Sequence, residues 1–499
     1  MRSLYIIFVV TLLVSCLAVS ASLSGTMQPT NEHAIHQPNE KRFLNPSNEK
    51  TKYIITPKDG TDETTRADIE KFLKKTTRAE SIYSFTDQTR GRFMWWTVHA
   101  TKEQYEQIKG YKGIAYVAAP TKLSDRRAIP TNWTDNRDSP DNSKELPLLS
   151  LVTKRDRGQV YQAQSEAPKE LRHISIPKGS DDLDEWSDYV YNKAAGENFY
   201  IYYISNGISD KDAVLQELPR ARVLDAVQTD YCKTLYGNEP RGYESRGTHS
   251  TCVASKAIGK TYGASKKAFL VPVKIGDMDL SGLSQGLDAA AKNVRDEGRQ
   301  KQAAVLISAG SEKVVDEHNL GDDEVVYQSQ NDYIGILADL GVSTIVATGN
   351  DANEMDGNGK LRLEPDTLPD ILAKHHPIIL VGNVDWDGKL WASSQRGDLV
   401  TSNAMGVDVT CVGKSGKKMT DTGTSFAAPL MAGQVANFVS SKDPSLPFNA
   451  EGISNREFVV KIRDFIRDEA YWKRSSGVKS LWNLVTKEIY EEAEREEDC

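Results

Sequence analysis

The sequence predicts an α/β fold with a mostly parallel sheet, preceded by a small α+β domain. Three observations support this prediction. Across residues 186–440, short apolar runs alternate with amphipathic helical stretches, which is the rhythm of parallel strands joined by crossover helices. Polar residues follow several of these runs. Parallel sheets form their functional sites at this position, beyond the carboxyl ends of the strands. Upstream, residues 52–120 alternate strands and helices in the order βαββαβ.

Residues 1–21 are typical of a signal peptide. Arg2 precedes an apolar run from Leu4 to Val14, and small residues follow at 18–21. We therefore expect the chain to be secreted to the extracellular space. A signal anchor is the alternative, but the run is short for a membrane helix. Residues 22–51 are polar and carry no hydrophobic period, so we expect a flexible leader.

The composition of the 499 residues narrows the class of protein. The net charge of −8 argues against a nucleic-acid partner, which usually requires a basic surface. No apolar run after the N-terminus is long enough for a membrane span. Cys16 is expected to leave with the signal peptide. The other cysteines can form up to two disulfides in an oxidising compartment, with the pairing open, and they are Cys232, Cys252, Cys411 and Cys499.

Residues 52–120 are expected to form the small α+β domain. Its predicted strands cover residues 53–55, 81–85, 92–98 and 113–119, and its predicted helices cover 65–75 and 102–109. Residues 121–185 are expected to be a charged linker. Its basic clusters at Arg126-Arg127 and at 154–157 are candidate cleavage sites, although such clusters are commonly just solvated. Asn132 begins a glycosylation sequon, which is consistent with secretion.

The larger predicted α/β domain spans residues 186–440. Its expected strands cover 268–275, 303–308, 342–347 and 378–384, and its expected helices cover 283–299 and 325–340. Residues 441–499 are expected to be a helical extension with helices at 455–469 and 478–497. The acidic end of this extension is interpreted as a solvated helix face.

One serine lies at the start of an apolar helix, in the run Gly423-Thr424-Ser425-Phe426-Ala427-Ala428-Pro429. The unpaired N–H groups and the dipole of a helix N-terminus stabilise developing negative charge, which suits a nucleophile. The alternative interpretation is an ordinary capped helix.

A histidine precedes a second helix of small residues, in the run His249-Ser250-Thr251-Cys252-Val253-Ala254. The chain has eight histidines and none follows His376, so no residue downstream of Ser425 can be its histidine base. The order with histidine first excludes an α/β-hydrolase.

With these motifs, residues 199–438 resemble the subtilisin-like serine proteases, especially the secreted fungal ones. The resemblance implies a three-layer fold in which Ser425 is the nucleophile and His249 the general base. It implies that Asn350, which follows a strand and Gly349, donates to the oxyanion. It also implies that a polypeptide substrate pairs with Ser308, Ala309 and Gly310, and that residues 52–120 are an inhibitory propeptide of a zymogen, a second partner for the cleft.

The sequence departs from this family at two positions. The strand that should end in the triad aspartate ends in Ser205, which cannot supply a charge to the imidazole. Ser250 replaces a glycine where backbones crowd. Asp210 is the nearby carboxylate that could substitute, after a local rearrangement. Two hypotheses therefore stand, an endopeptidase with an atypical triad and a pseudoprotease that binds polypeptides without turnover.

We expect no cofactor and no catalytic metal. The pairs His33/His36 and His375-His376 lack nearby ligands at the spacing of a zinc site. Calcium sites occur in the family that the chain resembles, so a structural calcium ion is left open.

Overall fold

The computed structural model describes residues 49–80, 82–125, 160–180, 182–237, 247–317, 319–473 and 477–497. The predicted signal peptide, most of the leader, both basic clusters, the sequon at Asn132 and Cys499 lie outside these residues. No helix in the described ranges has the length and apolar character needed to cross a membrane.

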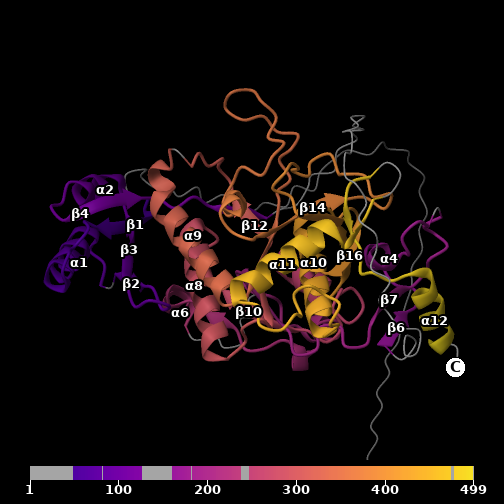
Figure 1. Cartoon of the computed structure of the whole chain (residues 1–499). Coiled ribbons are helices and arrows are strands. Elements are labelled where there is room, and N and C mark those ends of the chain that lie inside the picture. The colour runs from indigo at the N-terminus through magenta and orange to yellow at the C-terminus, as the bar shows by residue number, and fades with distance from the viewer. Residues whose placement is uncertain are drawn as a thin grey trace, which may run out of the picture. The chain divides into compact units, whose positions relative to one another are not determined.

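A nine-stranded sheet forms the centre of the larger domain (Figure 1). Its neighbours pair in parallel except for the two short strands β18 and β19, which pair antiparallel. In spatial order the strands are β18 (Tyr471–Trp472), β19 (Ser480–Leu481), β15 (Ser402–Met405), β14 (Ile379–Val384), β13 (Ser343–Ala347), β11 (Ala303–Ile307), β8 (Tyr200–Ser205), β10 (Phe269–Lys274) and β9 (Val227–Gln228). The strand predictions for this domain are matched to within one or two residues.

Helices cover both faces of this sheet because its strands alternate their side chains. On β8, Ile201 and Tyr203 enter one core, which contains apolar residues of α7 (Thr248–Ile258) and α10 (Thr424–Ser440). Tyr202 and Ile204 enter the opposite core, with α8 (Leu280–Asp296) and α9 (Glu324–Asp339). The predicted three-layer α/β fold is confirmed.

The sheet reverses its order beside β8. From β8 the chain proceeds through β10 on one side, and it then returns to β11 on the other side. The segments that follow β8 and β11 therefore diverge at the carboxyl edge of the sheet, which is where open α/β sheets form their clefts. Ser205 ends β8 and Ser308 follows β11, so the topology brings both to this edge.

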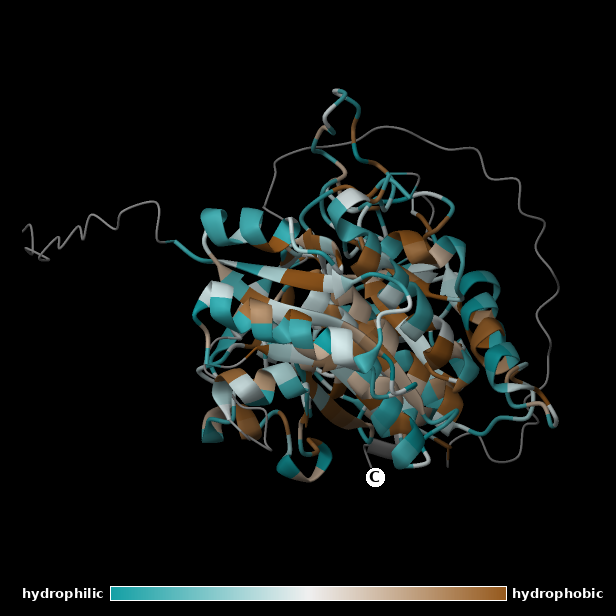
Figure 2. Cartoon of the chain, turned by 90° about the vertical axis from the view of Figure 1, so that its left-hand side faces the viewer, coloured by the Kyte–Doolittle hydropathy of each residue, from teal (hydrophilic) through white to brown (hydrophobic). Residues whose placement is uncertain are grey.

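The small α+β domain forms its own four-stranded antiparallel sheet in the order β2-β3-β1-β4. Ile55 and Trp96 face its own helices, while their neighbours Ile54 and Trp95 pack in the core that holds α8 and α9. Figure 2 views the chain from this side, with hydrophilic residues on the outer helical turns and hydrophobic residues between the layers. The predicted order of elements is confirmed in β1 (Thr51–Pro57), α1 (Glu63–Thr77), β2 (Tyr83–Thr86), β3 (Phe93–Ala100), α2 (Lys102–Lys109) and β4 (Ile114–Ala118).

The predicted linker 121–185 differs from the structure on both sides of its undescribed centre. Strand β5 (Leu123–Asp125) pairs with β12 (Ala309–Ser311). Residues 160–180 contain β6 (Tyr161–Gln164) and α4 (Lys169–Ser175), and Leu171 and Ile174 of α4 are fully buried in the main core. The described ends of this stretch thus form short elements with few but buried apolar positions.

The predicted extension 441–499 also belongs to the larger domain. Helix α11 (Asn455–Asp468) buries Phe458, Val459 and Ile462 in the main core, and β18 and β19 extend the central sheet. The second helix, α12 (Lys487–Glu497), begins nine residues later than the predicted start at 478, because Ser480 and Leu481 pair as strand β19.

Candidate active site

Ser425 is the second residue of α10, as the sequence predicted. The helix is preceded by Gly423, whose φ of 153° is a conformation that side chains disfavour. Gly423 donates its N–H to the carbonyl of Gly406 at 2.9 Å, which ties the helix start to the end of β15. Ser425 itself is fully buried.

The start of α10 meets the ends of β11 and β13. Ser425 Oγ donates to the carbonyl of Ser308 at 3.0 Å, and Ser308 Oγ donates to the carbonyl of Ser425 at 3.3 Å. Asn350 Oδ1 accepts the N–H of Thr424 at 3.1 Å, and Gly349 N–H donates to Thr424 Oγ1 at 3.3 Å. The structure therefore brings together three of the residues singled out in the sequence.

His249 is the second residue of α7, and its ring packs edge-on against Phe426 with the ring centroids 5.5 Å apart. Its base nitrogen Nε2 is buried without a hydrogen-bond partner among the described residues. The same is true of Asn350 Nδ2, the amide donor beside the start of α10. Such atoms cost about 1–3 kcal/mol each when they stay unpaired, so each requires an explanation.

The position of the triad aspartate is occupied by Ser205, whose buried Oγ accepts the N–H of Gly207 at 3.2 Å. Asp210 is exposed beyond the end of β8. Within the described part of the chain, no hydrogen bond or ion pair joins the His249 ring to either residue. The local rearrangement that would bring Asp210 to the ring is not present.

Ser250 replaces the glycine of the family pattern at the third residue of α7. It is buried, and its Oγ donates to Asn206 Oδ1 at 3.1 Å. Asn206 directly follows Ser205 in the chain, so Ser250 hydrogen bonds to the neighbour of the other departure from the family pattern.

A carboxylate nevertheless lies against His249, and sequence reasoning missed it. Asp125 Oδ1 lies 3.0 Å from His249 Nδ1. Asp125 is the last residue of β5, which pairs antiparallel with β12 so that Ala309 lies opposite Asp125 and Gly310 opposite Ser124. The signal that could have indicated Asp125 was its place in the sequence, directly after the α+β domain and before the basic pair at 126–127.

Strand β5 is held from both sides. On one side it pairs with β12, which begins within the predicted substrate-pairing run at residues 308–310. On the other side, Leu123 N–H donates to the carbonyl of Met278 and Leu280 N–H donates to the carbonyl of Thr121, both at 2.9 Å. Leu123 is buried in the same core as α8 and α9. The chain thus lays its own extended segment along the edge where a substrate strand was expected.

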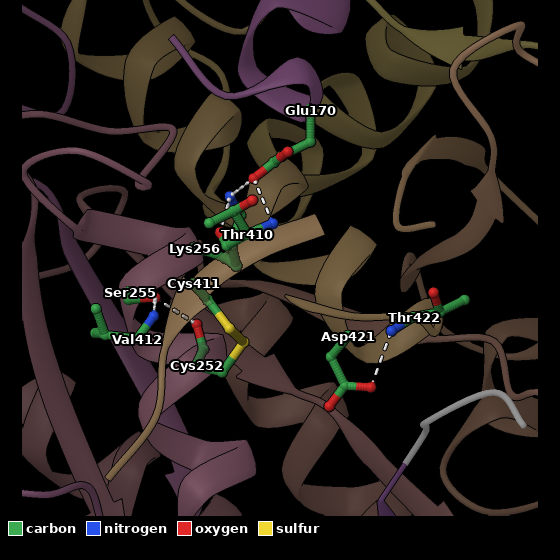
Figure 3. Close-up of a disulfide and its surroundings, with 9 residues drawn as sticks. All are labelled: Glu170, Cys252, Ser255, Lys256, Thr410, Cys411, Val412, Asp421 and Thr422. Atoms are coloured by element: carbon green, nitrogen blue, oxygen red, sulfur yellow. Dashed lines mark hydrogen bonds and ion pairs between the residues drawn. A yellow bond between two sulfur atoms is a disulfide. The ribbon is translucent and has the colours of Figure 1, made fainter. Parts of the chain in front are cut away.

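A disulfide between Cys252 and Cys411 joins α7 to β16 (Val409–Val412), and Figure 3 shows its surroundings. Beside it, Lys256 is fully buried against the carboxylate of Glu170 and donates to the carbonyl of Thr410 at 3.0 Å. Burial lowers the pKa of Lys256, and the charge of Glu170 opposes this shift. These links anchor the helix that carries His249.

The disulfide resolves the cysteine pairing that the sequence left open, as far as the described residues reach. Cys232 is buried in α6 (Asp230–Tyr236). The described ranges contain no group of three or more His, Cys, Asp or Glu side chains placed to hold a metal ion.

The larger domain is thus a three-layer α/β fold in which buried Ser425 and His249 lie at two helix starts and β5 pairs with β12. Residues 160–485 match the model of the subtilase family, Peptidase S8, and the chain belongs to this family.

Curated relatives include subtilisin-like protease 2 of Trichophyton rubrum, which is 27% identical over 289 residues, covering 56% of this chain and 58% of the relative. A subtilisin-like protease of Coccidioides posadasii is 28% identical over 287 residues, covering 55% and 59%. The match thus spans less than two thirds of the length of these relatives.

Solved structures support the fold. The crystal structure of an epidermin leader peptide processing serine protease from Staphylococcus aureus superposes with a TM-score of 0.50 at 17% identity, covering 85% of this chain and all of that one. A mutant of the same enzyme gives a TM-score of 0.51 at 16% identity, covering 83% and 99%.

Proposed function

We propose that this chain is a secreted serine endopeptidase with an atypical triad, made as a zymogen. Ser425 attacks a peptide carbonyl, His249 Nε2 takes the Oγ proton, and Asn350 Nδ2 donates to the oxygen that becomes negative. When the C–N bond breaks, Nε2 returns the proton to the leaving amine. Water then releases the acyl group by the same route.

Two buried atoms that have no hydrogen-bond partner in the described part of the chain carry this proposal. Asn350 Nδ2 can only donate, and a tetrahedral intermediate is an acceptor that forms beside Ser425. His249 Nε2 needs a proton donor, and the hydroxyl of Ser425 becomes one when it leaves the carbonyl of Ser308. One reaction at Ser425 therefore gives both atoms the partners they lack.

The small α+β domain supports the zymogen part of the proposal. It packs on α8 and α9 through its sheet, and it is followed by β5, which pairs with β12. A domain that buries apolar surface in this way and also fills the substrate-pairing strand acts as a competitive inhibitor until the connection is cut.

Expression in a secretory host tests the proposal. The full-length chain is compared with Ser425→Ala and with the control Ser415→Ala, a residue that is exposed after β16. We expect the parent and the control to release the α+β domain and to react with a fluorophosphonate probe, and Ser425→Ala to do neither. The size of the secreted products and their labelling are the measurements.

Ser205 makes a pseudoprotease the specific alternative, because a neutral residue in place of the triad aspartate lowers turnover by about 10⁴. Identical processing of all three proteins with no labelling in any of them would favour that alternative over the endopeptidase.

A further inference from the structure

Asp125 occupies the place in the hydrogen-bonding scheme that a triad aspartate would fill. A triad carboxylate accepts Nδ1–H of the histidine, fixes the tautomer that leaves Nε2 as the base, and stabilises the imidazolium formed during attack. Here Asp125 Oδ1 lies 3.0 Å from Nδ1, and Nε2 is buried without another partner in the described part of the chain. Ser205 offers no charge for this role.

We infer that the carboxylate missing from position 205 is supplied by the bound polypeptide, at the residue that pairs with Ala309. In the zymogen this residue is Asp125, which acts as a positioning residue through His249. The inference rests on the proposed function and deepens it. It defines the substrate class as extended segments with an acidic side chain at the position of Asp125.

Backbone pairing makes the arrangement general for such segments. Main-chain hydrogen bonds to β12 set the register of the bound strand, whatever its sequence. Side chains alternate along a strand, so the residue opposite Ala309 is directed differently from its neighbour Ser124. An aspartate at this position of another polypeptide would reach His249 by the same geometry.

During attack the charges balance as follows. The Oγ proton of Ser425 passes to His249 Nε2 while the Oγ–C bond forms and the carbonyl π electrons move to oxygen. The carboxylate of Asp125 stays ionised and holds Nδ1–H of the imidazolium. His249 is 5% exposed at its side chain and Asp125 is 45% exposed. This carboxylate is therefore screened by water more than a buried one, and it stabilises the imidazolium less.

The bound segment also controls the rate of turnover. Departure of the segment that carries Asp125 removes the charge, so the enzyme turns over rapidly only while an acidic segment occupies the cleft. Segments that are neutral at this position bind the same edge but are cleaved slowly.

A mutant cycle in the full-length chain tests the inference. The rate of Ser425-dependent processing is followed by pulse–chase in secreting cells for the parent, Asp125→Asn, Asp125→Glu, Ser205→Asp and the double variant Ser205→Asp/Asp125→Asn. Asp210→Asn is the matched control, because Asp210 is exposed and loses the same charge. The amount of secreted chain and its circular dichroism report folding.

We expect Asp125→Asn to slow processing by a factor between about 10 and 10⁴, the upper value being the effect of removing a triad carboxylate. Asp125→Glu should recover part of this rate, and Asp210→Asn should match the parent. In the Ser205→Asp background, Asp125→Asn should change the rate less than about threefold, because the enzyme then carries its own carboxylate. A structural defect at Asp125 would not be rescued from position 205.

Other outcomes separate the inference from the proposed function. Ser425-dependent processing at the parent rate in Asp125→Asn would overturn the inference and leave the endopeptidase. An equal loss in both backgrounds would also overturn it, since Asp125 would then serve binding alone. Processing by Ser205→Asp but not by the parent would show that Asp125 is insufficient. No Ser425-dependent processing in the parent or in Ser205→Asp would overturn the proposed function itself.

A second readout uses the secreted, processed enzyme and synthetic peptides with the sequence of residues 118–131. The peptide with aspartate at position 125 is compared with one that carries asparagine there, and the cleaved bond is identified from product masses. We expect kcat to fall at least tenfold with asparagine while KM changes little. A change confined to KM would contradict the positioning role.

Discussion

The two halves of the candidate active site differ in how they are built. The nucleophile half consists of Ser425, Ser308 and Asn350, which hydrogen bonds between α10, β11 and β13 hold together within the larger domain. In the acid half, Ser205 lacks a charge and the carboxylate at the histidine comes from β5, outside that domain. Under the proposed function, the groups that would hold the oxyanion are fixed within the larger domain, and the charge for the base would come from β5.

The largest effect is expected from restoring the acid half. Ser205→Asp would place a buried carboxylate at the end of β8, where the family carries its aspartate. If this half limits turnover, hydrolysis of a peptide with no acidic residue should rise by up to about 10⁴ in the processed enzyme. The measurement is kcat/KM on one neutral peptide for both proteins.

Ser205→Asn is the matched control for this change, because it adds similar volume without charge. A rise in Ser205→Asn equal to that in Ser205→Asp would contradict an electrostatic cause. No rise in either variant would show that the acid half does not limit the rate.

Damage to the nucleophile half is expected to have the next largest effect. Asn350→Ala removes the Nδ2 donor, and loss of one oxyanion donor lowers kcat by about 10²–10³. Because Nδ2 has no partner among the described residues, stability should change less than activity. Steady-state kinetics and urea unfolding measure the two quantities, with Asn358→Ala in an exposed loop as the control.

A loss of stability as large as the loss of activity, expressed as free energy, would show that Asn350 serves the fold through its Oδ1 bond to Thr424. An unchanged kcat would remove the oxyanion role from this half of the site.

Sequence patterns predicted the nucleophile half better than the acid half for a physical reason. The start of α10 and the strand before Asn350 are local patterns in which glycine, small residues and apolar runs follow one another. The contact between Asp125 and His249 joins residues far apart in sequence through a three-residue strand that carries no periodicity. Likewise, Leu171 and Ile174 in α4 are too few to reveal a core helix within a charged stretch.

The order of elements in the α+β domain was also predictable, because the spacing of apolar residues differs between its strands and its helices. The disulfide was not, because pairing depends on the approach of α7 to β16 across 159 positions. The late start of α12 follows from strand pairing at Ser480, a contact that no helical period reveals.

The disulfide is expected to stabilise the acid half of the site, because it fixes the helix that carries His249. Replacing Cys252 and Cys411 together by alanine in a Ser425→Ala parent should lower the free energy of unfolding by about 2–4 kcal/mol, because the unfolded chain gains freedom. Urea unfolding is the measurement. Reduction with dithiothreitol should cause a similar loss in the parent and little change in the double variant, and equal changes in both on reduction would contradict a cross-link effect.

The smallest effect concerns how firmly the separable segment is docked, and it depends on pH. Asp288 on α8 accepts the N–H groups of Gln88 and Thr89 in the α+β domain at 2.8 and 3.1 Å. Burial, with the nearby charge of Asp87, raises its pKa from 3.8 to about 6, although the hydrogen bonds oppose the shift. Its contribution to stability is therefore complete below pH ~4 and is lost as the pH rises through 6.

Between pH 5 and 7.5 the Ser425→Ala zymogen should consequently lose about 1–2 kcal/mol of stability through Asp288. Asp288→Asn should remove this part of the pH dependence, whereas Asp296→Asn, an exposed change on the same helix, should retain it. Urea unfolding at the two pH values gives the difference. Asp87 titrates in another window, because hydrogen bonds from Thr89 and Arg90 outweigh its burial and lower its pKa. If the free energy of unfolding of Asp288→Asn still changes with pH as it does in the parent, the α+β domain is held independently of this carboxylate. Release of Asp125 would then depend on cleavage rather than on pH.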